Sequence, residues 1–350
     1  MKKVIKYCFI SFIFLFILIS FLHIASRIFI PKWLENEDNM YTWIKKGFYE
    51  EKRNSLDLLF VGNSDVYRGI SPMVLWDEYG IPSYAYSGPG QRVWTGYYMM
   101  KEALEYQNPK VIVFDVDAAF SESHSGKSNY RKVFDNMKPN QVKWEAINDN
   151  VFEFSWSEKF SFYFPIFRYH SRYSDLTKKD FTYAFSNYHF AYKGLDMTAK
   201  IKPYTKGFDY MQEKGEVEQL SEKVKTYLDK IVLLCKEKDI PLILIELPSA
   251  ASWSLAKSKA ISLYALENGL TFIDLNLNPE ETGLDWMTDS SDGGDHLNVQ
   301  GAEKITKYLG NYLTSQFDFI DRRSDENYQI WHEDSKKYNQ DKMERIQANK

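Results

Sequence analysis

From residue 56 onward, short apolar runs alternate with stretches of helical periodicity, and this alternation constrains the fold more than any other feature. The runs expected to form strands are residues 56–62, 83–86, 110–116, 241–247 and 271–275. The stretches expected to form helices are residues 72–79, 93–106, 216–238, 253–267 and 299–316. Such alternation is typical of a parallel sheet covered by helices. The sequence therefore predicts an α/β fold with a central parallel sheet.

One long segment, residues 118–206, interrupts the alternation. It contains no clean strand–helix unit and is rich in aromatic residues, as in the run FEFSWSEKFSFYFPIFRYHSRY. We interpret it as an insertion, partly helical, attached after the third strand. Loops that follow the carboxyl ends of parallel strands lie at the active-site edge of such sheets, so we expect the insertion to start at that edge.

The N-terminus is a long apolar run in which Lys6 is the only formal charge between Val4 and Ala25. About 20 apolar residues can span a bilayer. A cleaved signal peptide is the alternative, but its apolar core would be shorter and would end at a site of small residues. We therefore expect an uncleaved signal anchor over residues 4–26. Lysines cluster before the run, which predicts a single-pass protein with its N-terminus inside and its C-terminal domain outside the cytoplasm.

These features divide the chain into four expected parts. Residues 1–30 form the membrane anchor and residues 31–55 a charged helical stalk. Residues 56–322 form the α/β domain with its insertion. Residues 323–350 form a polar tail, helical or mobile, to which we assign no chemistry.

Composition excludes several classes of function. A net charge of -4 and a pI near 6.0 give no electrostatic basis for binding nucleic acid. The two cysteines, Cys8 and Cys235, predict neither a disulfide framework nor a cysteine-rich zinc site. Aromatic residues make up 17% of the chain, which suits a carbohydrate-binding surface, a membrane interface or a simple compositional bias.

The first predicted strand ends in Gly62-Asn63-Ser64-Asp65. A turn from a strand to a helix exposes a serine, and such a serine becomes a nucleophile when a base takes its proton. The alternative is that Ser64 or Asp65 simply caps the following helix.

A glycine-rich polar loop, residues 292–298, precedes the last predicted helix. It holds His296, the one histidine of the six that lies in such a loop, together with Asp292 and Asp295. A carboxylate here would orient the imidazole and stabilise its charged form. The alternatives are a helix cap or a divalent-ion loop, but a calcium loop would need more oxygen ligands, so we expect no metal.

The turn after the second predicted strand, residues 87–91, contains Gly88 and Gly90. Glycines allow backbone N–H groups to approach a substrate oxygen closely. An ordinary turn would use the same residues.

Taken in order, these three blocks resemble the SGNH (GDSL-like) hydrolase superfamily over residues 56–116 and 216–317. The resemblance implies a flavodoxin-like three-layer sandwich, Ser64 as nucleophile, His296 as base and no cofactor. The usual acid position, three residues before the histidine, is Gly293 here. We therefore expect Asp292 to be the acid, with Asp295 as the alternative.

The third block of that superfamily departs further. Its usual asparagine, an oxyanion donor, is replaced by Asp115-Val116-Asp117. Because a carboxylate repels an oxyanion, we expect the donors to be the N–H of Ser64, the N–H of Gly90 and the side chain of Gln91.

Within the superfamily, the chain most resembles the membrane-anchored branch that acylates envelope polysaccharides and D-alanylates teichoic acids. This implies an acyl-enzyme on Ser64, formed from an acylated donor and resolved by a carbohydrate hydroxyl or by water. A multi-spanning membrane acyltransferase is the implied partner. The alternative is a non-catalytic assembly protein that binds an envelope polymer or that acyltransferase. Candidate substrate-binding residues are Arg68, Arg168, His170 and Arg172, although the last three also suit a solvated helix face.

Overall fold

The computed structural model describes residues 1–31, 41–121, 128–212 and 216–349. They form two compact units. The helical unit comprises the described residues of Met1–Thr42 and Phe134–Asn187, and the sheet unit those of Trp43–Val133 and Tyr188–Lys350. The first part of the expected stalk, residues 32–40, lies outside the described residues.

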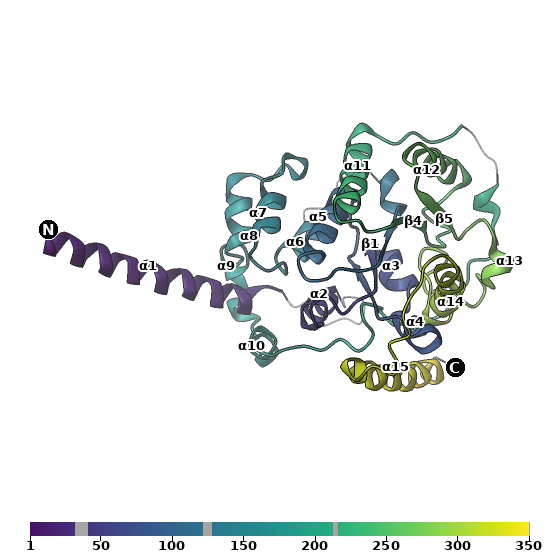
Figure 1. The fold of residues 1–350 in the computed structure, drawn as a ribbon. Coiled ribbons are helices and arrows are strands. Elements are labelled where there is room, and N and C mark those ends of the chain that lie inside the picture. The colour runs from purple at the N-terminus through teal and green to yellow at the C-terminus, as the bar shows by residue number, and fades with distance from the viewer. Residues whose placement is uncertain (32–40, 122–127, 213–215, 350) are drawn as a thin grey trace. The chain divides into compact units, whose positions relative to one another are not determined.

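The sheet unit is built on five parallel strands in the order β2-β1-β3-β4-β5. Figure 1 labels β1, β4 and β5, with helices around them. These strands are β1 (Leu58–Gly62), β2 (Ser83–Ser87), β3 (Val111–Asp115), β4 (Leu242–Glu246) and β5 (Thr271–Asp274). Every residue of β1 to β4 is buried, which explains why these strands read as nearly continuous apolar runs. The predicted α/β fold with a central parallel sheet is confirmed.

Helices cover both faces of the sheet, which makes the three-layer sandwich. On one face α14 packs against α3 and α4, and elsewhere α5 packs against α11. The helices of the sheet unit are α3 (Ser64–Gly69), α4 (Pro72–Tyr79), α5 (Val93–Ala103), α11 (Glu222–Glu237), α12 (Leu255–Asn268), α13 (Pro279–Thr282), α14 (Val299–Gln316) and α15 (Gln329–Ala348). Two further helices, α2 (Tyr41–Glu50) and α6 (Ser128–Phe134), cross the boundary between the units.

Local signals account for where these helices begin. The Asn298 side chain accepts hydrogen bonds from the N–H groups of Gln300 and Gly301, so α14 begins at Val299 as predicted. Helix α11 begins six residues later than predicted, at Glu222, because the side chain of Ser221 caps it.

The polar C-terminal segment forms a long helix, α15, which packs against α4. Its average composition conceals two large anchors, Trp331 and Tyr338, which are almost fully buried. The Trp331 ring lies 5.3 Å from the ring of Trp76 on α4, and Ser71 donates a hydrogen bond to the Tyr338 hydroxyl at 3.0 Å. These contacts hold the C-terminal helix on the sheet unit.

The helical unit contains α1 (Lys2–Phe29), α7 (Gln141–Asn148), α8 (Trp156–Tyr163), α9 (Ile166–Tyr169) and α10 (Lys178–Phe185). Its small core is aromatic. The rings of Phe134 and Phe152 lie 5.0 Å apart, and those of Phe154 and Phe162 lie 4.6 Å apart. Short helices linked by irregular turns account for the missing strand–helix pattern in this part of the sequence.

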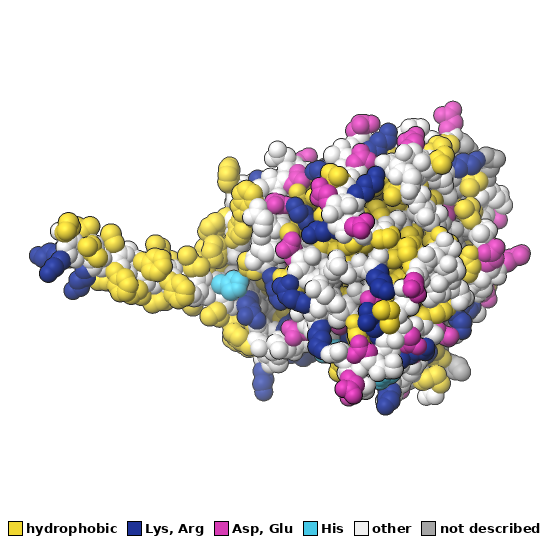
Figure 2. Space-filling model, viewed as in Figure 1, with side chains coloured by type: hydrophobic (Ala, Val, Ile, Leu, Met, Phe, Trp, Pro, Cys, Tyr) yellow, Lys and Arg dark blue, Asp and Glu magenta, His cyan; other side chains and the backbone are white. Residues whose placement is uncertain are grey.

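Helix α1 is the one helix among the described residues that is long and apolar enough to cross a membrane. Apolar side chains cover it along its length, with basic side chains at its N-terminal tip (Figure 2). By length and composition it fits either a membrane anchor or a signal sequence.

Candidate active site

Ser64 lies at the carboxyl edge of the sheet, directly after β1. It is the first residue of α3 and is half-buried. The residue that caps α3 is Asn63, whose Oδ1 accepts a hydrogen bond from the Asp65 N–H at 2.8 Å. The interpretation of Ser64 or Asp65 as the cap is therefore wrong, and the Ser64 hydroxyl is not used for capping. The phenol of Tyr67, one turn along α3, interacts with the Ser64 side chain.

Gly62 allows the turn before Ser64 to pack closely against the next strand. A Cβ at this position would lie 2.5 Å from Asp115 Cβ and 2.7 Å from Val66 Cγ2. Neither neighbour is free to move, because both are buried in the sheet unit.

We expect Gly62→Ala to destabilise the protein by about 1–3 kcal/mol, the usual cost of overpacking a core. The measurement is the thermal unfolding of the full chain in detergent. Gly69→Ala is the matched control, because a Cβ there would meet Leu247 Cδ1 at 3.3 Å and the flexible leucine can yield. Equal stabilities of the two variants would show that the approach to Asp115 is not tight.

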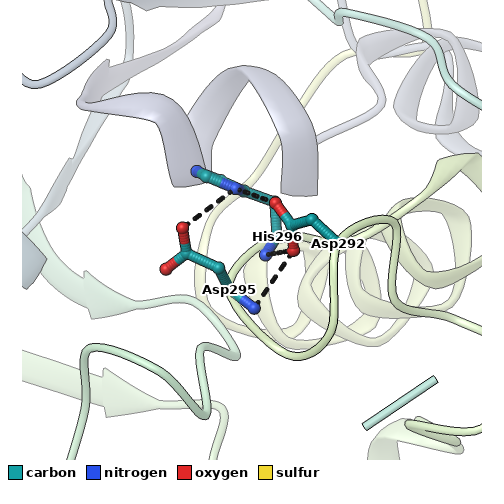
Figure 3. Close-up of side chains that lie close together, drawn as sticks. All are labelled: Asp292, Asp295 and His296. Carbon is teal, nitrogen blue, oxygen red and sulfur yellow. Dashed lines mark hydrogen bonds and ion pairs between the residues drawn. The ribbon is translucent and has the colours of Figure 1, made fainter. Parts of the chain in front are cut away.

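His296 is held by the carboxylate of Asp292 within one short loop (Figure 3). Asp292 Oδ2 lies 2.6 Å from His296 Nδ1. Asp292 Oδ1 accepts hydrogen bonds from the N–H of His296 at 2.8 Å and from the N–H of Asp295 at 3.2 Å. Asp295 Oδ2 lies 3.4 Å from the same ring nitrogen, so its contact is weaker. Asp292 and His296 form an acid–base pair whose orientation the backbone fixes.

Electrostatics keep Asp292 ionised. Partial burial alone would raise the pKa of its carboxyl group, but hydrogen bonds from the ring and backbone of His296 outweigh it and lower the pKa below its usual value. Gly293 and Gly294 have φ angles of +97° and +103°, which allow the loop to fold back so that Asp292 reaches the ring.

The histidine loop is fixed to the segment that carries Ser64. Ser290 Oγ accepts hydrogen bonds from the N–H groups of Gly293 and Gly294, at 3.0 and 2.7 Å. Leu297, next to His296, is buried in the same apolar cluster as Val66 of α3. The structure therefore brings the serine turn and the histidine loop to one edge of the sheet.

Acidic side chains are concentrated at this edge. Asp117 Oδ2 accepts a hydrogen bond from Asn63 Nδ2 at 2.6 Å, and Asp117 Oδ1 accepts one from Ser252 Oγ at 2.5 Å. Asp115 and Glu246 are 1% and 0% exposed, and no carboxyl oxygen of either has a well-aligned hydrogen-bond donor. Burial, followed by the charge of Asp117, raises the pKa of both well above the usual values. The raised pKa of Asp115 lessens the repulsion of an oxyanion that the sequence predicts from this residue.

Glu246 provides a test through pH. The folded state keeps its carboxyl group protonated above the usual pKa of 4.5, whereas the unfolded state loses that proton. The contribution of this carboxyl group to the free energy of unfolding is therefore fully present below pH 4.5. It is lost as pH rises toward the pKa of the folded state, at about 1.4 kcal/mol per pH unit. We expect Glu246→Gln to remove this loss, so its advantage in melting temperature over the wild type should grow between pH 4.5 and 8. Glu267→Gln, at an exposed position on α12, controls for loss of a charge, and a constant difference across pH would contradict the expectation.

The turn after β2 lies beside the serine turn, because the Gly88 N–H donates to the Gly62 carbonyl at 3.3 Å. Gly90 has a φ of +60°. Gln91 is buried, and its Nε2 faces the carbonyl groups of Pro89 and Asn129 at 3.2 and 3.4 Å. Donation by Gln91 to an oxyanion would require these contacts to break.

The other predicted binding residues have structural partners. Arg68 pairs with Asp196 at 3.0 Å inside the sheet unit. Arg168, His170 and Arg172 belong to the helical unit, so the structure does not join them to Ser64. His170 Nδ1 lies 3.1 Å from the Phe167 carbonyl oxygen.

Two side chains at this edge escaped the sequence interpretation. In the sequence Asn63 is only part of the serine motif. In the structure it caps α3 and donates a hydrogen bond to Asp117. Ser252 lies in an irregular turn after β4 and carries no motif, so only the fold reveals its contact with Asp117.

Asp292, Asp295 and His296 are also the one group in the described chain whose ligand atoms lie close enough for a metal ion. However, Nδ1 of His296 already contacts Asp292 at 2.6 Å. A metal at that nitrogen would displace this contact, so the geometry favours the acid–base pair.

Comparisons with known proteins assign no family to the chain. No protein-family model matches it. No curated protein matches it either. Among the solved structures that match, one is described as a "putative acylhydrolase" from Bacteroides fragilis. It is 14% identical, with a TM-score of 0.35, over 82% of this chain and 99% of the other. A likeness this distant carries no conclusion about fold or activity.

Proposed function

We propose that the sheet unit is a serine-dependent acyltransferase or esterase of the SGNH type. The observation that carries this proposal is the Asp292–His296 pair, fixed at the sheet edge where Ser64 begins α3. A paired carboxylate and imidazole, and a serine on a strand-to-helix turn at the same sheet edge, are the parts that acyl transfer through serine requires.

The contacts of His296 support a role for each ring nitrogen. His296 Nδ1 donates its proton to Asp292, which leaves Nε2 as the base for Ser64. As Ser64 Oγ attacks the acyl carbonyl, its proton moves to Nε2, and that proton then passes to the departing alkoxide. The acyl-enzyme is resolved when Nε2 takes a proton from water or from a sugar hydroxyl, whose oxygen attacks the same carbonyl carbon. The bond between that carbon and Ser64 Oγ then breaks, and Nε2 returns the proton to Ser64 Oγ. The N–H groups of Ser64 and Gly90 are the proposed donors to the oxyanion.

The setting of the reaction follows from α1. Its apolar length suits a single-pass anchor over residues 4–26, with the N-terminus inside and both units outside the cytoplasm. There the acylated donor would come from a multi-spanning membrane acyltransferase, and the acceptor would be a carbohydrate of the cell envelope.

The test is labelling of the full chain in detergent with a fluorophosphonate probe, which reacts only with activated serines. We expect the modification at Ser64, its absence in Ser64→Ala and a strong reduction in His296→Ala. Labelling that survives in Ser64→Ala would contradict the assignment. With p-nitrophenyl acetate as donor, an oligosaccharide acceptor that becomes acetylated would mark a transferase, and release of acetate alone an esterase.

The acidic sheet edge favours one alternative. Asp117 and Asp295 carry carboxyl groups near Ser64's turn, and negative charge there opposes an oxyanion. A non-catalytic protein that uses this fold to bind an envelope polymer or a membrane acyltransferase would tolerate these carboxyl groups. Wild-type protein that resists the probe but binds the polymer would support this alternative.

A further inference from the structure

The helical unit is tied to the last turns of α1. Ala25 and Ser26 are buried there, and Ser26 Oγ accepts a hydrogen bond from the Ile166 N–H at 3.2 Å. Arg172 donates to the Phe29 carbonyl at 2.7 Å. Helices α9 and α10 and the turn His170–Ser174 all contact α1. The position of α1 in a bilayer would therefore set the position of these segments.

The free length of α1 matches a bilayer. Residues 2–19 are exposed along their whole length, and the first buried or partly buried side chains are Ser20, Leu22, Ala25 and Ser26. Eighteen helical residues span about 27 Å at 1.5 Å per residue, close to the roughly 30 Å of a hydrocarbon core. The last part of the proposed anchor, residues 20–26, would then lie in the headgroup region, where the segments that touch α1 begin.

Those segments, together with α8, which packs against α9, carry exposed phenylalanines, which we name the aromatic rim: Phe160, Phe167, Phe181 and Phe185. They are 50%, 49%, 47% and 57% exposed. Phe160 and Phe167 pack together, with ring centroids 5.1 Å apart. Phe185 lies 5.8 Å from the Arg27 guanidinium of α1. Phenylalanine has no polar group to gain from water, so a cluster of half-exposed rings indicates an apolar or interfacial neighbour.

Basic residues adjoin the aromatic rim. Arg168 follows Phe167, and Lys178 and Lys179 lie in the first turn of α10 ahead of Phe181, all exposed. Lysine and arginine at the level of phosphate groups, with aromatic rings just below them, are the usual composition of a membrane interface. A lipid surface is favoured over a sugar because it matches both the rings and the exit of α1.

We propose that the aromatic rim inserts into the headgroup region of the outer leaflet around α1, so that α8, α9 and α10 form a membrane-resting platform. This inference rests on the proposed anchoring by α1. The ligand is the lipid bilayer itself.

The platform is tested by labelling the protein with the fluorophore NBD and reconstituting it into lipid vesicles that contain no other protein. The background is full-length Cys8→Ser, in which the remaining cysteine, Cys235, is buried. NBD is attached at Phe167→Cys or at Phe181→Cys. The control position is Leu266→Cys on α12, because Leu266 is 78% exposed. A separate sample carries the label on native Cys8. Nitroxide lipids report contact with the bilayer, and aqueous iodide reports contact with water.

We expect shallow nitroxide lipids to reduce the emission at 167 and 181 roughly twofold, and iodide to quench these sites several-fold less than position 266. Quenching by iodide equal to that at 266 would overturn the platform. The platform would also be overturned if positions 167 and 181 were shielded from both quenchers and lost this shielding at one copy per vesicle. In that case a second copy of the protein, and not lipid, would cover the aromatic rim. Quenching of the Cys8 label by deep nitroxide lipids reports insertion of α1 separately, so failure of the platform is distinguishable from failure of the anchor.

Discussion

Ser64→Ala is expected to lower the turnover of an activated ester by roughly three to six orders of magnitude, the range seen when serine hydrolases lose their nucleophile. The reason is chemical, because alanine offers no oxygen to carry the acyl group. The fold should persist, since Asn63 and not Ser64 caps α3. The measurement is the initial rate with p-nitrophenyl acetate in detergent, with circular dichroism to confirm folding.

Ser252→Ala is the matched control for this experiment. Ser252 also presents a hydroxyl group at the carboxyl edge of the sheet, but its Oγ donates to Asp117 and has no acyl group to carry. We expect a loss of less than about tenfold, because the change removes one hydrogen bond to a carboxylate outside the proposed triad. Similar losses in the two variants would contradict the assignment of Ser64.

Asp292→Asn is expected to lower turnover by about two to four orders of magnitude, through the tautomer of His296. The N–H groups of Asp295 and His296 both donate to one oxygen of Asp292, and this arrangement would hold the asparagine oxygen in place. The amide NH2 of the asparagine would then face Nδ1, which must become an acceptor. The ring proton moves to Nε2, and His296 can no longer take a proton from Ser64.

Asp295→Asn separates the two candidate acids. Its carboxylate is half exposed and lies 3.4 Å from Nδ1, so we expect a change of less than about tenfold. If Asp295→Asn proved the more damaging substitution, the acid would be Asp295, and the pair seen in the structure would not be the one that acts during the reaction. Both variants are compared at the pH of maximum wild-type activity.

Most of the sheet was predictable because β1 to β4 are buried on both faces and therefore leave nearly continuous apolar runs. Helix α14 was predictable for a different reason. Its apolar residues Ala302, Ile305, Leu309 and Leu313 recur at helical spacing, and all four are fully buried. Within the histidine loop, the preference for Asp292 relied on glycines that let the chain fold back, and Gly293 and Gly294 adopt such positive φ angles.

Other features depend on contacts that no local pattern encodes. Glu246 ends an apolar strand and gives no sign of its complete burial, which depends on strand ends and turns from distant parts of the sequence. The meeting of Ser252 and Asp117 joins two irregular turns. Helix α15 looked polar on average, since two buried aromatic anchors hardly change the composition of twenty residues.

The packing of α15 and α14 on α4 and α3 has a consequence for the order of folding. The elements that carry Ser64 meet their partners only near the end of the chain, so a nascent polypeptide must keep Trp76 and its neighbours uncovered through almost the whole of synthesis. Contacts this distant along the chain form slowly, because closing long loops costs entropy before any contact rewards it. If the chain is exported as proposed, a core that is completed last would keep it unfolded during passage through a translocation pore, as export requires.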